Sequence, residues 1–152
     1  YSLLNQVAGR SGRSTKPGKV IIQCFNTKHY SIICASNHDY LSFYNEDMSI
    51  RKKLKYPPYY NLCLIKLNGT NYEKLFKEAN KIKEYLKANT KDIIILGPSA
   101  STIPKIHNKY YIQIIIKYKN LKQIYDNLKF ITDKSKQLND IVLDIDINPK
   151  KI

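Results

Sequence analysis

The segment that decides the fold is YYIQIIIKY, residues 110–118. Side chains in a β-strand point alternately to opposite faces, so this run has two distinct faces. One face carries Ile112, Ile114, Ile116 and Tyr118, and the other carries Tyr111, Gln113, Ile115 and Lys117. The first set is apolar throughout, while the second mixes aromatic, amide and cationic groups. The run therefore predicts a strand with one face in a core and the other exposed enough to bind a ligand.

Strand and helix patterns alternate on both sides of this run. NLCLIKL (61–67), DIIILG (92–97) and the strictly alternating IVLDIDI (141–147) predict three more strands. Helical spacing of apolar residues follows Asn71, which can cap a helix, and appears again between residues 121 and 131. The positions concerned are Leu75, Ala79, Ile82 and Leu86, then Leu121, Ile124, Leu128 and Ile131. The order βαββαβ predicts an α+β, ferredoxin-like domain with a four-stranded antiparallel sheet covered by both helices on one face. Residues from Pro98 to the start of the third strand are expected to form a loop.

Consecutive prolines at Tyr56-Pro57-Pro58 divide the chain, because they stop a helix and force an extended path. We therefore expect two domains, residues 1–56 and 57–152. In the first we expect a helix from about Leu3 to Ala8, a turn at Lys16-Pro17-Gly18 and a strand over Lys19–Phe25. A long helix from about His29 to Leu54 is expected to follow.

The charge of the chain points to a polyanionic partner. The formal net charge is +14, and no acidic residue occurs before Asp39 or between Asp92 and Asp126. Clustered cations of this kind are typical of nucleic-acid binding, although a general bias toward Lys, Ile, Asn and Tyr is the alternative. The candidate nucleic-acid contacts are Arg51, Lys52, Lys53, Lys105, Lys109, Tyr110, Tyr111 and Lys117. The competing interpretations are that the 29–54 helix only joins the two domains, and that residues 103–111 form a solvated loop with core tyrosines.

Other classes of site lack the residues that they require. Cys24, Cys34 and Cys63 form no C-x-x-C pair, and neither His107 nor the carboxylates of the last strand have a metal-binding partner in the sequence. We expect no metal site. No apolar run approaches the roughly 20 residues of a membrane span, and no signal peptide is present. We expect a soluble, cytoplasmic protein with no membrane partner.

The stretch QVAGRSGR (6–13) contains two of only three arginines in the chain, Arg10 and Arg13. A helix could simply end there, with Gly9 as a left-handed cap. A phosphate-cradling loop is disfavoured, because G-x-x-x-x-G-K-[ST] is absent. In the third interpretation both arginines face a phosphoryl group, which a guanidinium binds in a bidentate manner.

These residues resemble motif VI of superfamily-2 helicases, Q-x-x-G-R-x-G-R, which lies in the second RecA-like lobe. The likeness continues through GKVIIQCFNTKHYSI, HDYLSFYNEDMSIRKKLKYPPYYNL, ILGPSASTIPKIHNKYYIQIIIK and VLDIDINP. In order and spacing these blocks are similar to the C-terminal portion of the PriA family of primosomal replication-restart helicases. The resemblance implies that residues 1–56 are the edge of a RecA-like lobe, an α/β remnant, and that residues 57–152 are a DNA-binding domain.

The resemblance also implies a function. Gln6, Gly9, Arg10 and Arg13 would belong to an ATP site, with Arg10 and Arg13 as catalytic arginines on the γ-phosphate. The whole protein would be an ATP- and Mg²⁺-dependent 3′→5′ DNA helicase that recognises stalled or recombined forks and directs primosome assembly at the bacterial nucleoid. Expected partners are single-stranded and forked DNA, single-stranded-DNA-binding protein and other primosome proteins, and a family zinc site is expected upstream. This chain contains no Walker A or Walker B motif, so we expect it to be inactive as an ATPase alone. The alternative is a self-contained ferredoxin-like module that binds RNA or DNA without ATPase activity.

Overall fold

The computed structural model describes residues 1–11 and 18–150. The chain divides into two compact units, Tyr1–Leu54 and Lys55–Ile152. The division falls just before the boundary that we expected at Tyr56. Each unit is described separately below.

The first unit consists of three helices joined by irregular segments. They are α1 (Ser2–Ala8), α2 (Tyr30–Ser36) and α3 (Tyr40–Lys53). The single helix expected over residues 29–54 is wrong, because the chain turns between α2 and α3. His38 has a positive φ of 55°, and the carboxylate of Asp39 then accepts a hydrogen bond from the Ser42 amide at 2.9 Å. An N-cap of this type begins a new helix and does not continue an old one.

The apolar run Lys19–Phe25 is not a strand, which corrects a second expectation. Its residues are irregular in conformation, Phe25 is fully exposed and Ile21 is 84% exposed. A strand needs a hydrogen-bonded neighbour, and within residues 1–11 and 18–54 no other strand is present to pair with this run. In the turn expected at residues 16–18, Lys16 and Pro17 lie outside the described residues.

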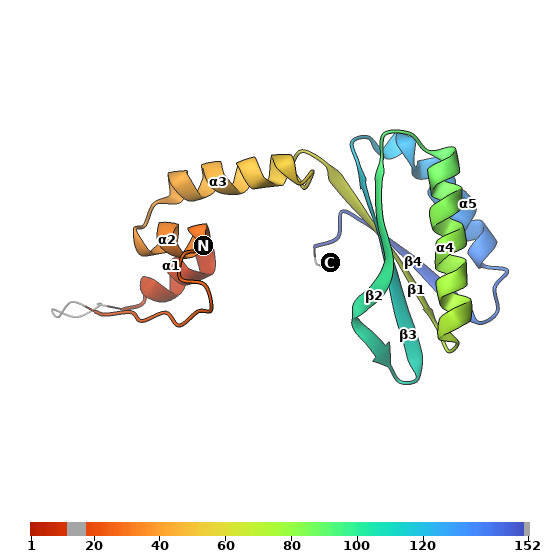
Figure 1. Cartoon of the computed structure of the whole chain (residues 1–152), viewed down its shortest axis with the longest axis horizontal. Coiled ribbons are helices and arrows are strands. Elements are labelled where there is room, and N and C mark those ends of the chain that lie inside the picture. Colours follow the sequence, from red (N-terminus) through yellow and green to blue (C-terminus); the bar gives the residue numbers. More distant parts are fainter. Residues whose placement is uncertain (12–17, 151–152) are drawn as a thin grey trace. The chain divides into compact units, whose positions relative to one another are not determined.

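The second unit has the predicted ferredoxin-like topology. Its strands are β1 (Asn61–Gly69), β2 (Ile94–Ile106), β3 (Lys109–Tyr118) and β4 (Ile141–Ile147). They form one antiparallel sheet in the order β2-β3-β1-β4. Helices α4 (Tyr72–Asn89) and α5 (Tyr125–Ser135) both cover the same face of this sheet (Figure 1). The prediction of a βαββαβ domain is therefore confirmed.

The core lies between the sheet and these two helices. Ile112, Ile114, Ile116 and Tyr118 of β3 are at most 1% exposed, which confirms the face assigned from the alternation. They pack with Cys63, Ile65 and Leu67 of β1 and with Leu75, Ala79, Leu86, Leu128 and Ile131 of the helices. Full burial of a side chain of this size contributes about 1.5–3 kcal/mol, so each of these residues stabilises the unit substantially.

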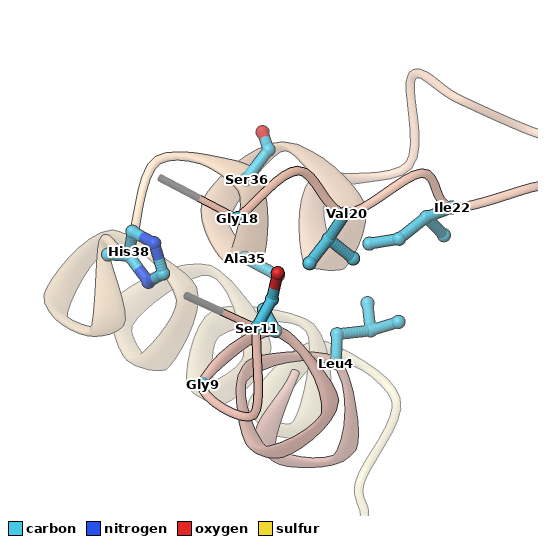
Figure 2. Close-up of a pocket in the computed structure, with 10 residues that line it drawn as sticks. Leu4, Gly9, Ser11, Gly18, Val20, Ile22, Ala35, Ser36 and His38 are labelled. Atoms are coloured by element: carbon cyan, nitrogen blue, oxygen red, sulfur yellow. The ribbon is translucent and has the colours of Figure 1, made fainter. Parts of the chain in front are cut away.

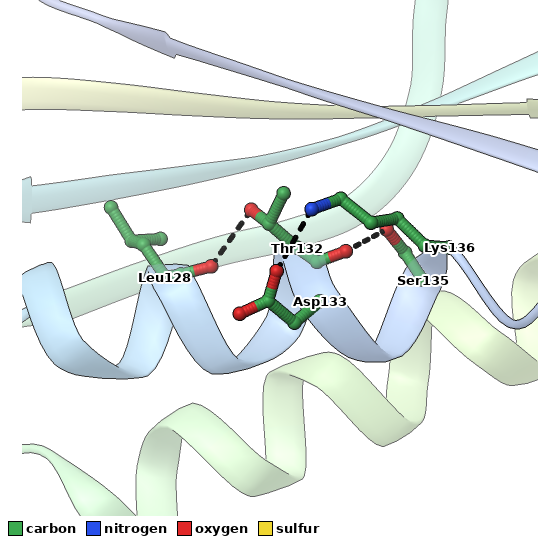
Figure 3. Close-up of polar contacts among 5 residues, drawn as sticks. All are labelled: Leu128, Thr132, Asp133, Ser135 and Lys136. Atoms are coloured by element: carbon green, nitrogen blue, oxygen red, sulfur yellow. Dashed lines mark hydrogen bonds and ion pairs between the residues drawn. The ribbon is translucent and has the colours of Figure 1, made fainter.

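Local signals in the sequence fix the ends of the two helices. The Asn71 side chain accepts a hydrogen bond from the Lys74 amide at 3.0 Å and caps α4, as predicted. Before α5, Asn120 and Gln123 form a capping box around a 3₁₀ turn, Leu121–Gln123. Near the end of α5, the hydroxyls of Thr132 and Ser135 donate to the carbonyls of Leu128 and Thr132, at 2.9 and 2.7 Å (Figure 3).

Strand β2 is longer than the sequence predicts, so the loop expected after Pro98 is wrong. The strand continues to Ile106 and turns into β3 through His107 and Asn108, which have φ angles of 45° and 62°. Two positive φ angles define the type I′ turn that matches the twist of a hairpin. Proline is tolerated because β2 is an edge strand whose register shifts after Leu96. At the shift, Gly97 has a φ of 96°, and a Cβ there would lie 2.8 Å from the Gln113 carbonyl oxygen.

The second face of the sheet is only partly open, which corrects another expectation. Leu62 and Leu64 of β1 point to this face and are 5% and 1% exposed. Lys117 of β3 is 6% exposed, with its Nζ 3.6 Å from the centre of the Tyr56 ring. The side chains of Tyr111, Gln113 and Ile115 are partly exposed. The accessible part of this face therefore lies toward the β2–β3 turn.

Candidate nucleic-acid interface

Two of the predicted contacts, Lys105 and Lys109, lie at the tip of the β2–β3 hairpin. Both side chains are exposed, and among the described residues no carboxylate oxygen lies within 4 Å of either ammonium group. Some lysines elsewhere on the unit do pair, as Lys81 does with Glu78 and Lys136 with Asp133. The hairpin tip therefore carries positive charge that no nearby acid neutralises. Phosphate groups are the natural counterions for such a tip.

The two tyrosines of the predicted set lie on opposite faces of β3. Tyr110 is on the helix side, where its ring meets Tyr72 edge to face at a centroid distance of 5.5 Å. The Lys105 ammonium lies 5.0 Å from the centre of the same ring. Tyr111 is on the other side, opposite Asn68 of β1, and is partly exposed. A single nucleobase could therefore stack on one of these rings but not on both.

Lys117 is not in the exposed position that we expected for a phosphate contact. Its ammonium lies over the Tyr56 ring, and little of its surface reaches solvent. A desolvated cation–ring contact of this kind can contribute about 2 kcal/mol. The Lys117 charge therefore stabilises the fold and is not available to a phosphate.

The basic end of α3 belongs to the first unit. Arg51 Nε donates to Asp47 Oδ2 at 2.6 Å, and Asp47 also accepts a hydrogen bond from the Tyr30 hydroxyl at 2.8 Å. Burial opposes ionisation of Asp47, but the hydrogen bonds from Arg51 and Tyr30 prevail and lower its pKa. Lys52 and Lys53 are exposed in the last turn of α3, where cations also complement the helix dipole. Arg51 thus has a role within its own helix, and the two lysines are available to an outside anion.

The motif VI residues surround the end of α1. Gln6 and Arg10 are exposed, and the Arg10 amide donates to the Val7 carbonyl at 3.2 Å. Gly9 has a φ of −68°, so the interpretation of this glycine as a left-handed cap is wrong. Arg13 lies outside the described residues.

Gly9 borders a cavity of about 450 Å³ within the first unit (Figure 2). Leu4 of α1, Val20 and Ile22 of the irregular segment and Ala35 of α2 lie around it. The described lining contains no Lys or Arg, and Arg10 is not part of it. The described part of the lining therefore supplies no cation for a nucleotide phosphate, and Arg10 is exposed.

Sequence reasoning missed a second set of cations, around Tyr60. The ammonium groups of Lys55 and Lys119 lie 5.8 and 5.4 Å from the centre of the Tyr60 ring. Lys55 precedes β1 and Lys119 follows β3, so only the pairing of these two strands brings them together. Lys119 lies in the acid-free segment between Asp92 and Asp126, but this did not distinguish it from other lysines, and no signal in the sequence linked Lys55 to it.

Other kinds of site find no support in the described part of the chain. No group of three or more His, Cys, Asp or Glu side chains is placed there to hold a metal ion. None of the helices described has the length and apolar character needed to cross a bilayer. Burial raises the pKa of the Cys63 thiol to about 12, so this cysteine is a core residue and not a nucleophile.

The fold and the basic hairpin define a ferredoxin-like α+β domain preceded by a helical unit. Residues 52–150 match the sequence model of the family described as Primosomal protein N C-terminal domain, and the chain belongs to this family. The resemblance to the C-terminal portion of PriA is thereby confirmed.

Similar proteins come from several bacteria. The replication restart protein PriA of Bacillus subtilis is 43% identical over 153 residues, which cover 98% of this chain and 19% of that protein. PriA of Synechocystis is 34% identical, with 100% of this chain and 18% of that protein covered. PriA of Borreliella burgdorferi is 31% identical, with 98% and 23% covered. The chain therefore spans about a fifth of the length of the curated relatives that it matches. Among solved structures, the de novo designed protein Foldit4 has a TM-score of 0.49 at 13% identity over 60% of this chain and 99% of its own, a likeness too weak to support a conclusion.

Proposed function

We propose that this chain is the C-terminal part of a replication restart protein and that its second unit holds DNA while the rest of the protein acts on the fork. The whole protein would be an ATP- and Mg²⁺-dependent 3′→5′ helicase that recognises stalled or recombined forks and directs primosome assembly. It would meet single-stranded-DNA-binding protein and other primosome proteins at the nucleoid, and its zinc site would lie upstream of this chain. Membership of the family and the similarity to replication restart proteins support this proposal.

The observation that carries the DNA-binding part is the unneutralised charge at the β2–β3 tip. Lys105 and Lys109 extend from a two-residue turn, so neither is shielded by a neighbouring element. Lysine contacts to phosphate release counterions, and this makes the affinity fall as the salt concentration rises. Tyr111 is the ring of this set that lies on the partly open face of the sheet, where a base could stack.

Replacing both tip lysines tests this part directly. In the Lys105→Gln, Lys109→Gln variant we expect weaker binding to an oligo-dT strand at low salt. For a single strand each lost phosphate contact changes the slope of log K against log salt by about 0.7, so the slope should fall by about 1.4. The matched control is Lys81→Gln, Lys136→Gln, which removes the same charge from two ion-paired lysines. Equal losses in both variants would show that net charge alone is responsible and would refute the assignment of the tip.

The ATP-binding part of the proposal concerns Arg10 and Arg13. Arg10 is exposed after α1, where its guanidinium is accessible to a nucleotide held by another part of the protein. Gln6 and Gly9 complete the motif on the same turn. An arginine that stabilises the charge on a transferred phosphoryl group is worth about 10³ to 10⁵ in rate. In the full-length protein, Arg10→Ala and Arg13→Ala should each abolish ATP hydrolysis while DNA binding is largely kept. ATPase activity retained in both variants would refute the arginine assignment.

A second candidate function is a binding module for RNA or DNA that works without ATPase activity. It is favoured because the second unit is compact and has a hydrophobic core of its own. The two candidates differ in what the full-length protein does. DNA-stimulated ATP hydrolysis is expected for the helicase, whereas a module without ATPase activity would bind single strands and leave ATP intact.

A further inference from the structure

A pocket of about 310 Å³ lies at the end of the sheet away from the β2–β3 tip. Tyr60, just before β1, forms one side, and Ile93 and Ile94, at the start of β2, supply apolar surface. The volume is at the lower end of the range of about 300–1,000 Å³ typical of small-ligand pockets. An aromatic ring beside aliphatic side chains suits a flat, partly apolar ligand.

Two cations flank this ring. Lys55 and Lys119 are exposed, and both ammonium groups lie more than 5 Å from the Tyr60 centroid. Both distances lie near the outer limit of about 6 Å for a cation–ring contact, so neither ammonium is held tightly by the ring. Exposed cation–ring contacts contribute only about 0.5–1 kcal/mol, and an anionic group could draw either lysine away.

The polar lining of the pocket distinguishes a base from a bare phosphate. The Asp92 carboxylate is exposed at the pocket and would repel an inorganic anion inside it. It would accept hydrogen bonds from amino or imino groups on a base edge. Gln123 uses its Oε1 to accept from the Asn120 amide at 3.0 Å, which leaves its Nε2 as a donor. The pocket thus offers the Asp92 carboxylate as an acceptor and the Gln123 Nε2 as a donor, and the cations Lys55 and Lys119 also line it.

We propose that this pocket takes one unpaired nucleotide of single-stranded DNA, with the base against Tyr60 and the neighbouring phosphates at Lys55 and Lys119. This inference rests on the proposed function, since it assumes that the second unit binds single strands. Stacking on a tyrosine requires a base that is not paired and stacked in a duplex, so the site selects single strands. It would be a second contact on the DNA path, separate from the β2–β3 tip.

The test compares the whole chain with Tyr60→Leu and Tyr60→Phe in fluorescence anisotropy with a labelled oligo-dT strand. Loss of a stacked base costs about 1–3 kcal/mol, which corresponds to about 5- to 150-fold in Kd. We expect Tyr60→Leu to weaken binding within this range and Tyr60→Phe to keep it. The matched control is Tyr125→Leu, which removes an exposed ring from α5 of the same unit; none of the cations that the structure describes lies over this ring.

A second readout protects the test against a variant that fails to fold. An oligonucleotide that contains 5-iodouracil should crosslink to wild-type protein at Tyr60, and mass spectrometry of the digested adduct locates the residue. Wild-type binding with unchanged affinity in Tyr60→Leu, or crosslinks confined to Tyr110 and Tyr111, would overturn the pocket proposal alone. Loss on replacing Lys55 and Lys119 by glutamine without loss in Tyr60→Leu would also overturn it, because the site would then bind an anion and no base. If wild-type protein binds no single strand at low salt, the proposed function itself fails.

Discussion

Replacing Ile114 with alanine should destabilise the second unit far more than replacing its neighbour Ile115. Ile114 is 0% exposed and lies between the sheet and the helices, opposite Ile65 of β1. Ile115 is on the other face, opposite Leu64, and is partly exposed. The two sites share one strand and one side-chain type, so they form a matched pair that differs only in the face occupied.

The magnitude follows from burial. Ile→Ala removes three carbon groups, and at about 0.8 kcal/mol for each buried group the transfer term alone is about 2.4 kcal/mol. An enclosed cavity adds to this, so Ile114→Ala should cost about 3–4 kcal/mol of the free energy of unfolding. For Ile115→Ala about half of the transfer term applies and no enclosed cavity forms, so we expect about 1 kcal/mol. Both variants also lose the preference of a β-branched residue for a strand. This loss is similar in the two, so it largely cancels in the difference between their free energies of unfolding.

Urea unfolding followed by circular dichroism measures the difference. With an m-value of about 2 kcal/mol per molar urea, the difference of about 2–3 kcal/mol separates the two midpoints by about 1–1.5 M. Equal midpoints, or a larger loss in Ile115→Ala, would refute the assignment of the helix-covered face.

Three further predictions concern single side chains. Asn71→Ala removes the N-cap of α4 and should lower the free energy of unfolding by about 1 kcal/mol in the same urea assay, while Asn71→Ser should restore most of it. Cys63 has a pKa of about 12, so at pH 8 only about 10⁻⁴ of it is thiolate, and a thiol reagent should label the other two, partly exposed cysteines of the native chain first. Asp47 has a lowered pKa in the folded state, so its ionised form stabilises the fold. This contribution to stability is complete above the pKa of about 3.9 that Asp47 has in the unfolded chain. It is lost as the pH falls through the lower pKa of the folded state. The melting temperature should therefore drop less between pH 6 and pH 3 in Asp47→Asn than in wild-type protein.

The sequence predicts the second unit well because its signals are local and agree with one another. The alternation of β3 and the helical spacing after Asn71 describe the same core from two sides, and the structure confirms both. The sequence did not predict the helix break at His38. Aromatic residues on both sides of it suggested one continuous helix, so Asp39 was not identified as an N-cap. The length of β2 was missed because Pro98 and Gly97 are usually loop signals, and their tolerance depends on an edge position that only the tertiary fold supplies.

The candidate site residues also differ in how well the sequence predicts them. Lys105 and Lys109 could be found from sequence because they lie close together in an acid-free segment. The sequence could not show that Lys117 is covered by Tyr56, because the two residues are far apart in the chain and meet only across the sheet. The grouping of Lys55, Tyr60 and Lys119 has the same cause, since it depends on the pairing of β1 with β3.

The central claim is that the second unit binds single-stranded DNA largely through its unpaired lysines. The most direct measurement is the affinity of this chain for an oligo-dT strand, determined by fluorescence anisotropy at salt concentrations from about 50 to 300 mM. Each phosphate contact contributes about −0.7 to the slope of log K against log salt. With Lys105 and Lys109 at the tip and Lys55 and Lys119 at the pocket, we expect a slope of about −3. An affinity that does not change with salt, or no binding at the lowest salt concentration, would contradict the claim.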